Sequence, residues 1–193
     1  MKRTGWLFVC LGLIVFEAPS VHAADGVAYH RNGSLGFHHV EAPIGGRLWF
    51  PGQTLGFDVG LGLRSTPASV DPDESELGWA IDFGVPFVLQ SWSGVHLLAR
   101  PGVLYESQEI GYDGDTGAPG VQFETETESR LTVTVELEAE VFLRDNFSVS
   151  GSHGVGFSTF DPGFGADSQT SFGTMGAQFT NIGFHLYCFG GAE

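Results

Sequence analysis

The clearest signal in the chain is an alternation of apolar and polar residues with a period of two. In Thr54–Arg64 the odd positions are Leu, Phe, Val, Leu and Leu, and the even positions between them are Gly, Asp, Gly and Gly. The same alternation recurs, with some interruptions, in Leu77–Leu89, Val95–Glu106, Leu131–Leu143, Phe147–Phe160 and Asn181–Phe189. Helical spacing would scatter these apolar residues around an axis, so the pattern predicts β-strands.

The connections between these segments alternate in length. Turn-forming residues make short connections at Pro51–Gln53, Ser91–Gly94 and Arg144–Asn146, and long ones at Ser65–Glu76, Ser107–Gly120 and Asp161–Gln169. Tight turns at one end and long loops at the other are typical of an antiparallel membrane barrel.

The N-terminal part must supply two further strands. We predict strands at Ser34–Ala42 and Gly46–Phe50. An alternative uses Asn32-Gly33 as a hairpin turn between Gly26–Arg31 and Ser34–Ala42. Either choice gives eight strands and puts both chain ends on the short-turn side. The predicted fold is all-β, a single antiparallel up-and-down β-barrel.

The first 23 residues predict a cleaved secretory signal peptide. Lys2 and Arg3 precede the apolar stretch Trp6–Phe16, and Val21–Ala23 places small residues near a cleavage point. The apolar stretch is shorter than the about 20 residues of a membrane-spanning helix. Residues 24–193 then form one barrel domain.

Composition excludes several classes of protein. The 29 glycines among 193 residues disfavour a helical bundle. The formal charge of −15 disfavours a nucleic-acid partner, because a binder must offer Lys and Arg to the phosphates. After the predicted cleavage Cys188 is the one remaining cysteine, so a disulfide within the mature chain is excluded. Because the glycines follow the strand alternation and form no phosphate-binding motif, we expect no cofactor.

The alternation fits a membrane barrel and, turned inside out, a soluble barrel. The polar positions are mostly Gly, Ser, Thr and isolated charges, which suit a crowded lumen better than a solvent-exposed surface. The apolar faces suit strands of about 9–11 residues that cross a bilayer, and aromatic residues near the strand ends suit its two interfaces. We therefore predict a transmembrane barrel. The alternative is a soluble secreted or periplasmic barrel that holds an apolar ligand, similar to a lipocalin.

The last predicted strand carries the most specific motif. A polar residue, a glycine two positions later and alternating apolar positions that end in an aromatic residue are supplied by Asn181, Gly183, Leu186 and Phe189. This motif resembles the assembly signal of the small eight-stranded outer-membrane barrels of Gram-negative bacteria, such as the outer membrane protein A and X type domains. The resemblance extends over Ser34–Phe189 as a pattern. Gly190–Glu193 depart from it, because the aromatic residue usually ends the chain in that family.

The resemblance implies a location in the cell outer membrane. It also implies two partners, the outer-membrane lipid and the outer-membrane assembly machinery. The protein would then be a small integral membrane protein with a structural or surface role and acidic extracellular loops.

If the apolar faces point outward, many charged side chains point into the lumen. They are Asp58, Arg64, Asp82, His96, Arg100, Glu106, Glu136, Glu138, Glu140 and His185. Carboxylates at alternate positions of one strand lie about 7 Å apart and need partners when buried. Arg64 and Arg100 are the obvious candidates. We predict a plug of salt bridges that keeps the barrel non-conducting, and a proton or cation path is the alternative.

Other candidate sites have less specific patterns. Acidic residues cluster at Asp71–Glu76, Asp113–Gly117 and Glu124–Glu128, and we interpret them as solvated surface charge, with weak Ca²⁺ or Mg²⁺ binding as the alternative. Ser152, His153 and Asp161 offer the side chains of a hydrolase, but a G-x-S-x-G motif is absent. We therefore expect a protein that is not an enzyme, and a lipid-modifying barrel enzyme is the second alternative.

His38 and His39 are neighbours on a predicted strand. Successive side chains of a strand point to opposite faces, so these two imidazoles are not expected to share a metal ion.

Overall fold

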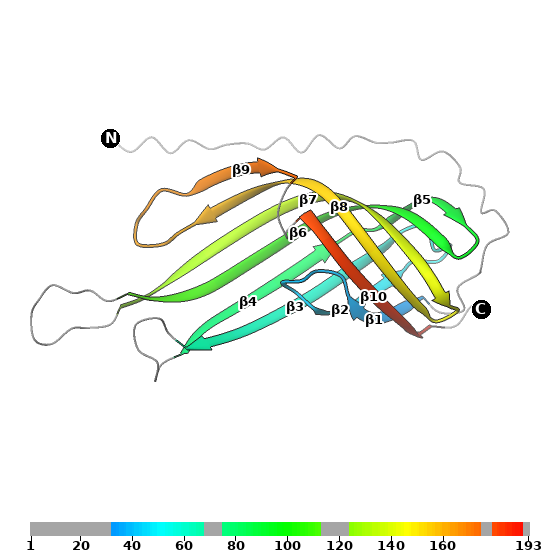
Figure 1. Cartoon of the computed structure of the whole chain (residues 1–193), viewed down its shortest axis with the longest axis horizontal. Helices are drawn as coiled ribbons and strands as arrows, with labels where there is room; N and C mark the ends of the chain where they lie inside the picture. Colours follow the sequence, from blue (N-terminus) through cyan, green and yellow to red (C-terminus); the bar gives the residue numbers. More distant parts are fainter. Residues whose placement is uncertain (1–31, 68–74, 113–123, 175–178, 191–193) are drawn as a thin grey trace, which may run out of the picture.

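The computed structural model describes residues 32–67, 75–112, 124–174 and 179–190, which form one sheet of ten strands (Figure 1). The strands are β1 (Gly33–Phe37), β2 (Ile44–Trp49), β3 (Gly56–Pro67), β4 (Ser75–Gly84), β5 (Phe87–Trp92), β6 (Val95–Tyr112), β7 (Glu124–Arg144), β8 (Phe147–Asp161), β9 (Gln169–Gly173) and β10 (Thr180–Phe189). No helix in these four ranges is long and apolar enough to cross a membrane. The predicted signal peptide and the alternative strand Gly26–Arg31 lie outside the described residues.

Eight of the strands close into an antiparallel barrel in the order β1-β2-β3-β4-β6-β7-β8-β10. The ring closes where β10 pairs with β1, from Gly33↔Phe189 to Phe37↔Phe184. The remaining two strands are additions to this ring, since β5 pairs with the first residues of β6 and β9 pairs with the last part of β8. The predicted all-β, eight-stranded antiparallel barrel is therefore confirmed.

Some predicted strand boundaries were wrong. The predicted strand Leu77–Leu89 is divided into β4 and β5 by Pro86, which has no N–H to donate to a neighbouring strand. The carbonyl of Pro86 instead accepts a hydrogen bond from the backbone N–H of Gly56 at 2.9 Å. The β6–β7 hairpin is longer than predicted, because the pairing continues to Tyr112↔Glu124.

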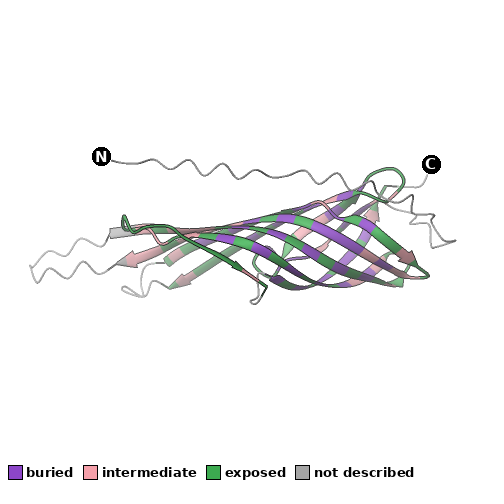
Figure 2. Ribbon diagram, turned by 90° about the horizontal axis from the view of Figure 1, so that it is seen from above, coloured by how far each residue is buried: buried purple, intermediate pink, exposed green. Residues whose placement is uncertain are grey.

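Apolar side chains cover the outside of the barrel, and polar side chains fill its inside. On β7, Val135 and Leu137 are 55% and 57% exposed, whereas Glu136 and Glu138 between them are almost fully buried. Buried and exposed residues alternate in this way along the strands (Figure 2). The polar face of the alternation thus lines the lumen, as predicted, and an inside-out barrel with an apolar interior is excluded.

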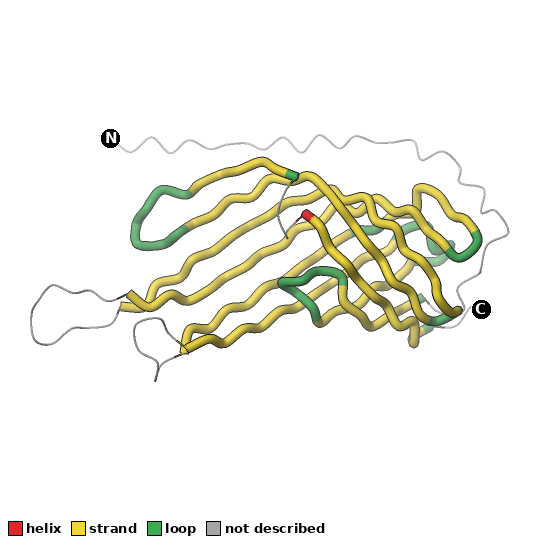
Figure 3. The backbone as a smooth tube through the Cα atoms, in the orientation of Figure 1, coloured by secondary structure: helices red, strands yellow, loops and turns green. Residues whose placement is uncertain are grey.

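The connection between β1 and β2 lies within the barrel. The predicted strand Ser34–Ala42 stops at Phe37, and the loop that follows lies about halfway along the barrel (Figure 3). The burial of His38, His39 and Ala42 shows that this loop enters the lumen. Ala42 is 1% exposed and packs with Ala80 and Leu104 of the inner wall. Gly62 leaves the room for this approach, because a Cβ there would lie 1.8 Å from the backbone oxygen of Glu41.

Among the described residues, the barrel wall is complete only in the half that ends in short turns. The β2–β3 pairing reaches no further than Ile44↔Leu61, and Gly62–Pro67 of β3 pair only with β4 in the described part of the chain. On the other side of the ring, the β8–β10 pairing reaches only His153↔Thr180. Beyond that point β8 pairs with β9, whose second edge has no partner strand among the described residues.

Candidate functional site

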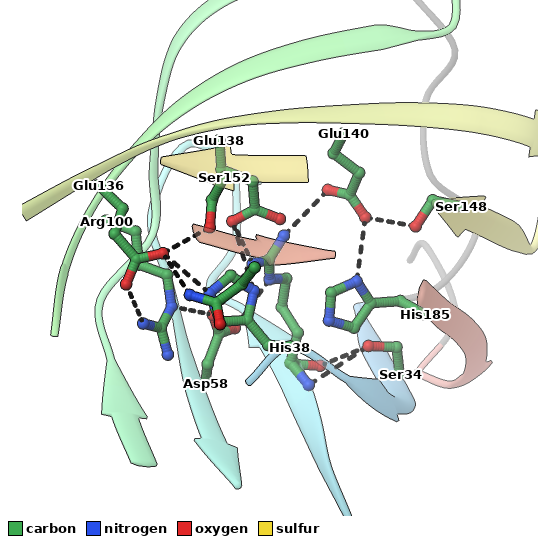
Figure 4. Close-up of polar contacts among 12 residues, drawn as sticks. Ser34, His38, Asp58, Arg100, Glu136, Glu138, Glu140, Ser148, Ser152 and His185 are labelled. Atoms are coloured by element: carbon green, nitrogen blue, oxygen red, sulfur yellow. Dashed lines mark hydrogen bonds and ion pairs between the residues drawn. The ribbon is translucent and has the colours of Figure 1, made fainter. Parts of the chain in front are cut away.

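Two arginines form the centre of a buried charge cluster in the lumen (Figure 4). Arg47 of β2 donates from Nε to Asp58 Oδ1 at 2.7 Å, from Nη2 to Glu138 Oε2 at 2.8 Å and from Nη1 to Glu140 Oε2 at 3.1 Å. Its side chain is fully buried. One guanidinium therefore joins carboxylates from two opposite walls of the barrel, β3 and β7.

Arg100 of β6 holds the second half of the cluster. It donates to Asp58 Oδ2 at 2.8 Å, to Asp82 Oδ2 at 2.5 Å and, with a longer contact of 3.5 Å, to Glu136 Oε1. Asp58 is shared by the two arginines, so these charged groups form one continuous network. Such charge-assisted bonds are the strongest polar contacts available in a protein interior.

Neutral donors also bind the carboxylates of Glu136 and Glu140. Ser152 donates to Glu136 at 2.6 Å, and Ser148 and Tyr187 donate to Glu140 at 2.5 and 2.8 Å. The Tyr187 hydroxyl itself accepts a hydrogen bond from the indole N–H of Trp49 at 3.1 Å. These donors come from β8, β10 and β2, so the cluster ties nearly every wall of the barrel together.

Two histidines lie against the same carboxylates. His38 Nε2 lies 3.4 Å from Glu136 and its Nδ1 lies 3.8 Å from Glu138, whereas His185 Nδ1 lies 3.5 Å from Glu140. His38 belongs to the inward β1–β2 connection, where His39 is also buried. The prediction that these neighbouring histidines point to opposite faces of a strand was wrong, because the strand has already ended.

The structure brings eight of the ten predicted lumen residues into the barrel interior as buried side chains: Asp58, Asp82, His96, Arg100, Glu136, Glu138, Glu140 and His185. Arg64 and Glu106 lie outside this cluster, near the long-loop end. Arg64 is exposed and donates to the Gln108 side chain, so its predicted role as a partner of the buried carboxylates was wrong. Glu106 is half-buried there.

Arg47 takes the place that was predicted for Arg64. The signal for it was present in the alternation, since Ile44 and Leu48 are apolar and exposed at even positions of β2. Because even-numbered residues of β2 point outward, the odd-numbered Arg47 is expected to point into the lumen. The prediction missed it because Pro43 and two adjacent glycines obscure where β2 begins.

The four residues of the predicted assembly signal divide between the two faces of β10. Asn181 points inward and donates to Glu136 at 3.4 Å, and Gly183 passes close to the backbone oxygen of Phe37. Leu186 and Phe189 are exposed on the outside. Asn181 therefore also contributes to the buried cluster.

Metal binding and hydrolysis find little support in this geometry. Ligand atoms of His38, Asp58 and Glu138 lie within 4.8 Å of one another, but Arg47 already binds both carboxylates and supplies the positive charge. Ser152 and His153 lie on opposite faces of β8, where Ser152 is buried and His153 is exposed. The exposed His153 ring contacts the Thr180 hydroxyl at 2.8 Å.

A second site is a cavity of about 490 Å³ between the charge cluster and the long-loop end. Its floor is the inward connection at Val40, Glu41 and Pro43. Its walls come from β3, β4, β6, β7 and β8, and its charged lining residues are Glu41, Arg64, Glu106, Glu128 and Arg130. We name this space the outer cavity.

A glycine of β4 allows Arg100 of the cluster to fit against the barrel wall. An added Cβ at Gly84 would lie 2.2 Å from Arg100 Cζ. Gly84→Ala is therefore expected to displace Arg100 from its carboxylates and to lower the free energy of unfolding by about 1–3 kcal/mol. Urea titration of the refolded protein measures this loss. Gly151→Ala is the matched control, because nothing lies within 4 Å of a Cβ at Gly151, and an equal loss in both variants would contradict the prediction.

Comparison with solved structures gives a likeness in fold to an outer membrane protein. The chain is similar to a major outer membrane protein from Thermus thermophilus, with 18% sequence identity and a TM-score of 0.41 over 80% of this chain and 97% of that chain. No protein-family model matches the chain, and no curated protein matches it in sequence. The resemblance to the outer membrane protein A and X type domains therefore stays a prediction.

Proposed function

We propose that the protein is a small integral outer-membrane barrel with a structural or surface role, and that the charge cluster closes its lumen. The observation that carries this proposal is the distribution of side chains in the closed barrel. Apolar residues such as Leu61 and Val135 are about half exposed on the outside, while five carboxylates and two arginines are buried inside. A water-soluble protein rarely exposes so much continuous apolar surface, whereas a bilayer requires it.

The closed lumen follows from the size of the barrel and the packing of the cluster. An eight-stranded barrel has an interior just wide enough for side chains to fill. Arg47 and Arg100 reach across it, and an inward connection covers the cluster on the long-loop side. Because the buried charges are paired with one another, a permeating ion would have to break those pairs.

Planar-bilayer recording of the refolded protein tests this closure. We expect no discrete conductance steps from the parent protein. The partition of the protein with the outer-membrane fraction after a carbonate wash tests its location independently. Stable, discrete steps would contradict the closed lumen, and release by carbonate would contradict membrane integration.

The topology gives a further prediction. Eight strands put both termini on one side, and in outer-membrane barrels the long loops face outward and the short turns face the periplasm. A protease added to intact cells is expected to cut within the predicted long connection Ser107–Gly120, of which residues 113–120 lie outside the described residues, and to leave a C-terminal tag intact. Loss of the tag under these conditions would reverse the proposed orientation.

The proposed partners are the membrane lipid and the outer-membrane assembly machinery, which would recognise the β10 segment with its exposed Leu186 and Phe189. The acidic segments Asp71–Glu76 and Asp113–Gly117 lie largely outside the described residues. We propose that they are solvated surface charge that binds divalent cations weakly at most. We propose no catalytic activity, because the polar side chains of the cluster are engaged with one another.

A further inference from the structure

We propose that the outer cavity binds the head group of a zwitterionic amphiphile, and that the acyl chain of this ligand leaves between the edges of β3 and β9 that have no partner strand among the described residues. The ligand would carry an ammonium group together with a phosphate or carboxylate. The inference rests on the proposed membrane location, because the opening would give access from the lipid.

The two arginines of the outer cavity form no direct ion pair with a described carboxylate, although both act electrostatically on Glu106. Arg64 donates to the Gln108 amide, and the guanidinium of Arg130 lies over the Phe160 ring at 5.2 Å. Neither arginine has a carboxylate within 4.0 Å in the described part of the chain, whereas Arg47 and Arg100 each contact three. Two cations in this acidic protein are thus left available for an anionic group.

Carboxylates of the same cavity are also left without an ion pair. Glu106 lies directly opposite Arg130 in the β6–β7 register, and Glu41 and Glu128 line the same space. No ion pair within 4.0 Å joins any of these three to a described cation. A simple anion would be repelled by the three carboxylates, and a simple cation by the two arginines. A ligand that carries both charges on one head group complements both sets, which is the electrostatic requirement for specific recognition.

The wall beside the cavity ends at an unpaired edge of β3 in the described part of the chain. The last residues of β3, Gly62–Pro67, have β4 on one side and no strand on the other among the described residues. Gly62, Leu63 and Arg64 of this free edge line the outer cavity. In Figure 1, β9 lies at the top of the barrel and the outer end of β3 lies at the bottom, with β4, β6 and β7 between them.

The free edge begins in the apolar outer surface. Leu63 is 81% exposed, and Ile44, at the end of the neighbouring strand, is 72% exposed. Leu63 lies opposite Trp79 in the β3–β4 register, and the ring centroids of Trp79 and Tyr105 are 5.2 Å apart. Tryptophan and tyrosine of this kind mark the membrane interface in outer-membrane barrels. An acyl chain that leaves the cavity here would therefore reach the hydrocarbon while its head group stays at the interface.

Binding to the protein refolded in dodecyl maltoside micelles tests the proposal. The probe is a single-chain lysophosphatidylethanolamine, followed by isothermal titration calorimetry. We expect saturable binding of one molecule per chain. Lysophosphatidylglycerol, which lacks the ammonium, and dodecylamine, which lacks the phosphate, are each expected to bind at least tenfold more weakly. Free phosphoethanolamine, which lacks the chain, is also expected to bind at least tenfold more weakly.

Two charge-neutralising variants locate the site. Arg130→Gln and Glu106→Gln are each expected to weaken lysophosphatidylethanolamine binding about tenfold, because each removes one charge-assisted contact. Arg144→Gln and Asp145→Asn at a short turn are the matched controls, since both residues are exposed at the other end of the barrel. Circular dichroism of every variant verifies that the barrel has folded.

The outcomes separate this inference from the proposed function. If lysophosphatidylglycerol or dodecylamine binds as tightly as lysophosphatidylethanolamine, the ligand need not be zwitterionic and the proposal is wrong. If free phosphoethanolamine binds as tightly, the acyl chain makes no contribution and the proposed exit between β3 and β9 is wrong. If Arg144→Gln and Asp145→Asn weaken binding as much as Arg130→Gln and Glu106→Gln do, the ligand does not bind in the outer cavity. Insertion into vesicles is measured separately, so a protein that inserts but does not bind overturns this inference alone.

Discussion

Arg47→Ala is expected to lower the free energy of unfolding by about 3–5 kcal/mol, the cost of removing one partner from a buried ion pair. The loss is large because Asp58, Glu138 and Glu140 would then stay buried without their shared cation. Arg100→Ala is expected to have an effect of the same size. Equilibrium unfolding in urea of the protein refolded in lipid vesicles is the measurement.

Arg144→Ala is the control for this prediction. Arg144 is the last residue of β7, and unlike Arg47 it is exposed and forms no ion pair with a described residue. Its removal is expected to change the free energy of unfolding by less than about 0.5 kcal/mol. A loss in Arg47→Ala as small as that in the control would show that the buried network contributes little to stability.

Val135→Arg is expected to cost about 2–4 kcal/mol, because it places a charge in the hydrocarbon near the middle of the bilayer. Val135 is 55% exposed on the outer face of β7, and it lies opposite Pro101 and Val155 on the neighbouring strands. The yield of folded protein in lipid vesicles is expected to fall accordingly.

Thr134→Arg is the matched comparison one position away. Thr134 is 5% exposed and faces the lumen, where its hydroxyl donates to Glu136 at 3.1 Å. The new arginine would meet carboxylates there, so that crowding and not lipid limits folding. The yield of Thr134→Arg is therefore expected to depend little on bilayer thickness, and the yield of Val135→Arg to depend on it strongly. Equal yields for Val135→Arg and the parent protein would contradict a lipid-facing Val135.

The fold could be predicted from the sequence because the alternation records the two environments of each strand. In β7 the unbroken series from Leu131 to Leu143 fixes which residues face inward, so Glu136, Glu138 and Glu140 were assigned to the lumen correctly. Strand ends were predicted less well. The β6–β7 hairpin continues beyond the apolar outer surface of the barrel, where both faces of the strands carry polar residues. Apolar and polar residues no longer alternate there, so the pattern does not show where the strands end.

The pairing of charges could not be predicted from the sequence. The alternation along a strand shows whether a side chain points into the barrel. Its position along the barrel axis depends on the tilt and stagger of all eight strands. Arg64 and Arg100 both have the inward parity of their strands, yet only Arg100 lies at the level of the buried carboxylates. The inward β1–β2 connection was equally hidden, because His38 acquires its carboxylate neighbours only after the strand has ended.

The span of the network along the chain has a consequence for the kinetics of folding. Arg47 and Glu140 are 93 positions apart, and Tyr187 reaches Glu140 from a further 47 positions away. Contacts between such distant segments make folding slow, because the entropy of ordering the intervening chain is lost before the contacts form. The first and last strands must also meet before either side of the cluster is complete. The complete network is therefore expected to form late, and a chain that lacks β10 would leave Glu140 without its Tyr187 donor and the ring open between β8 and β1.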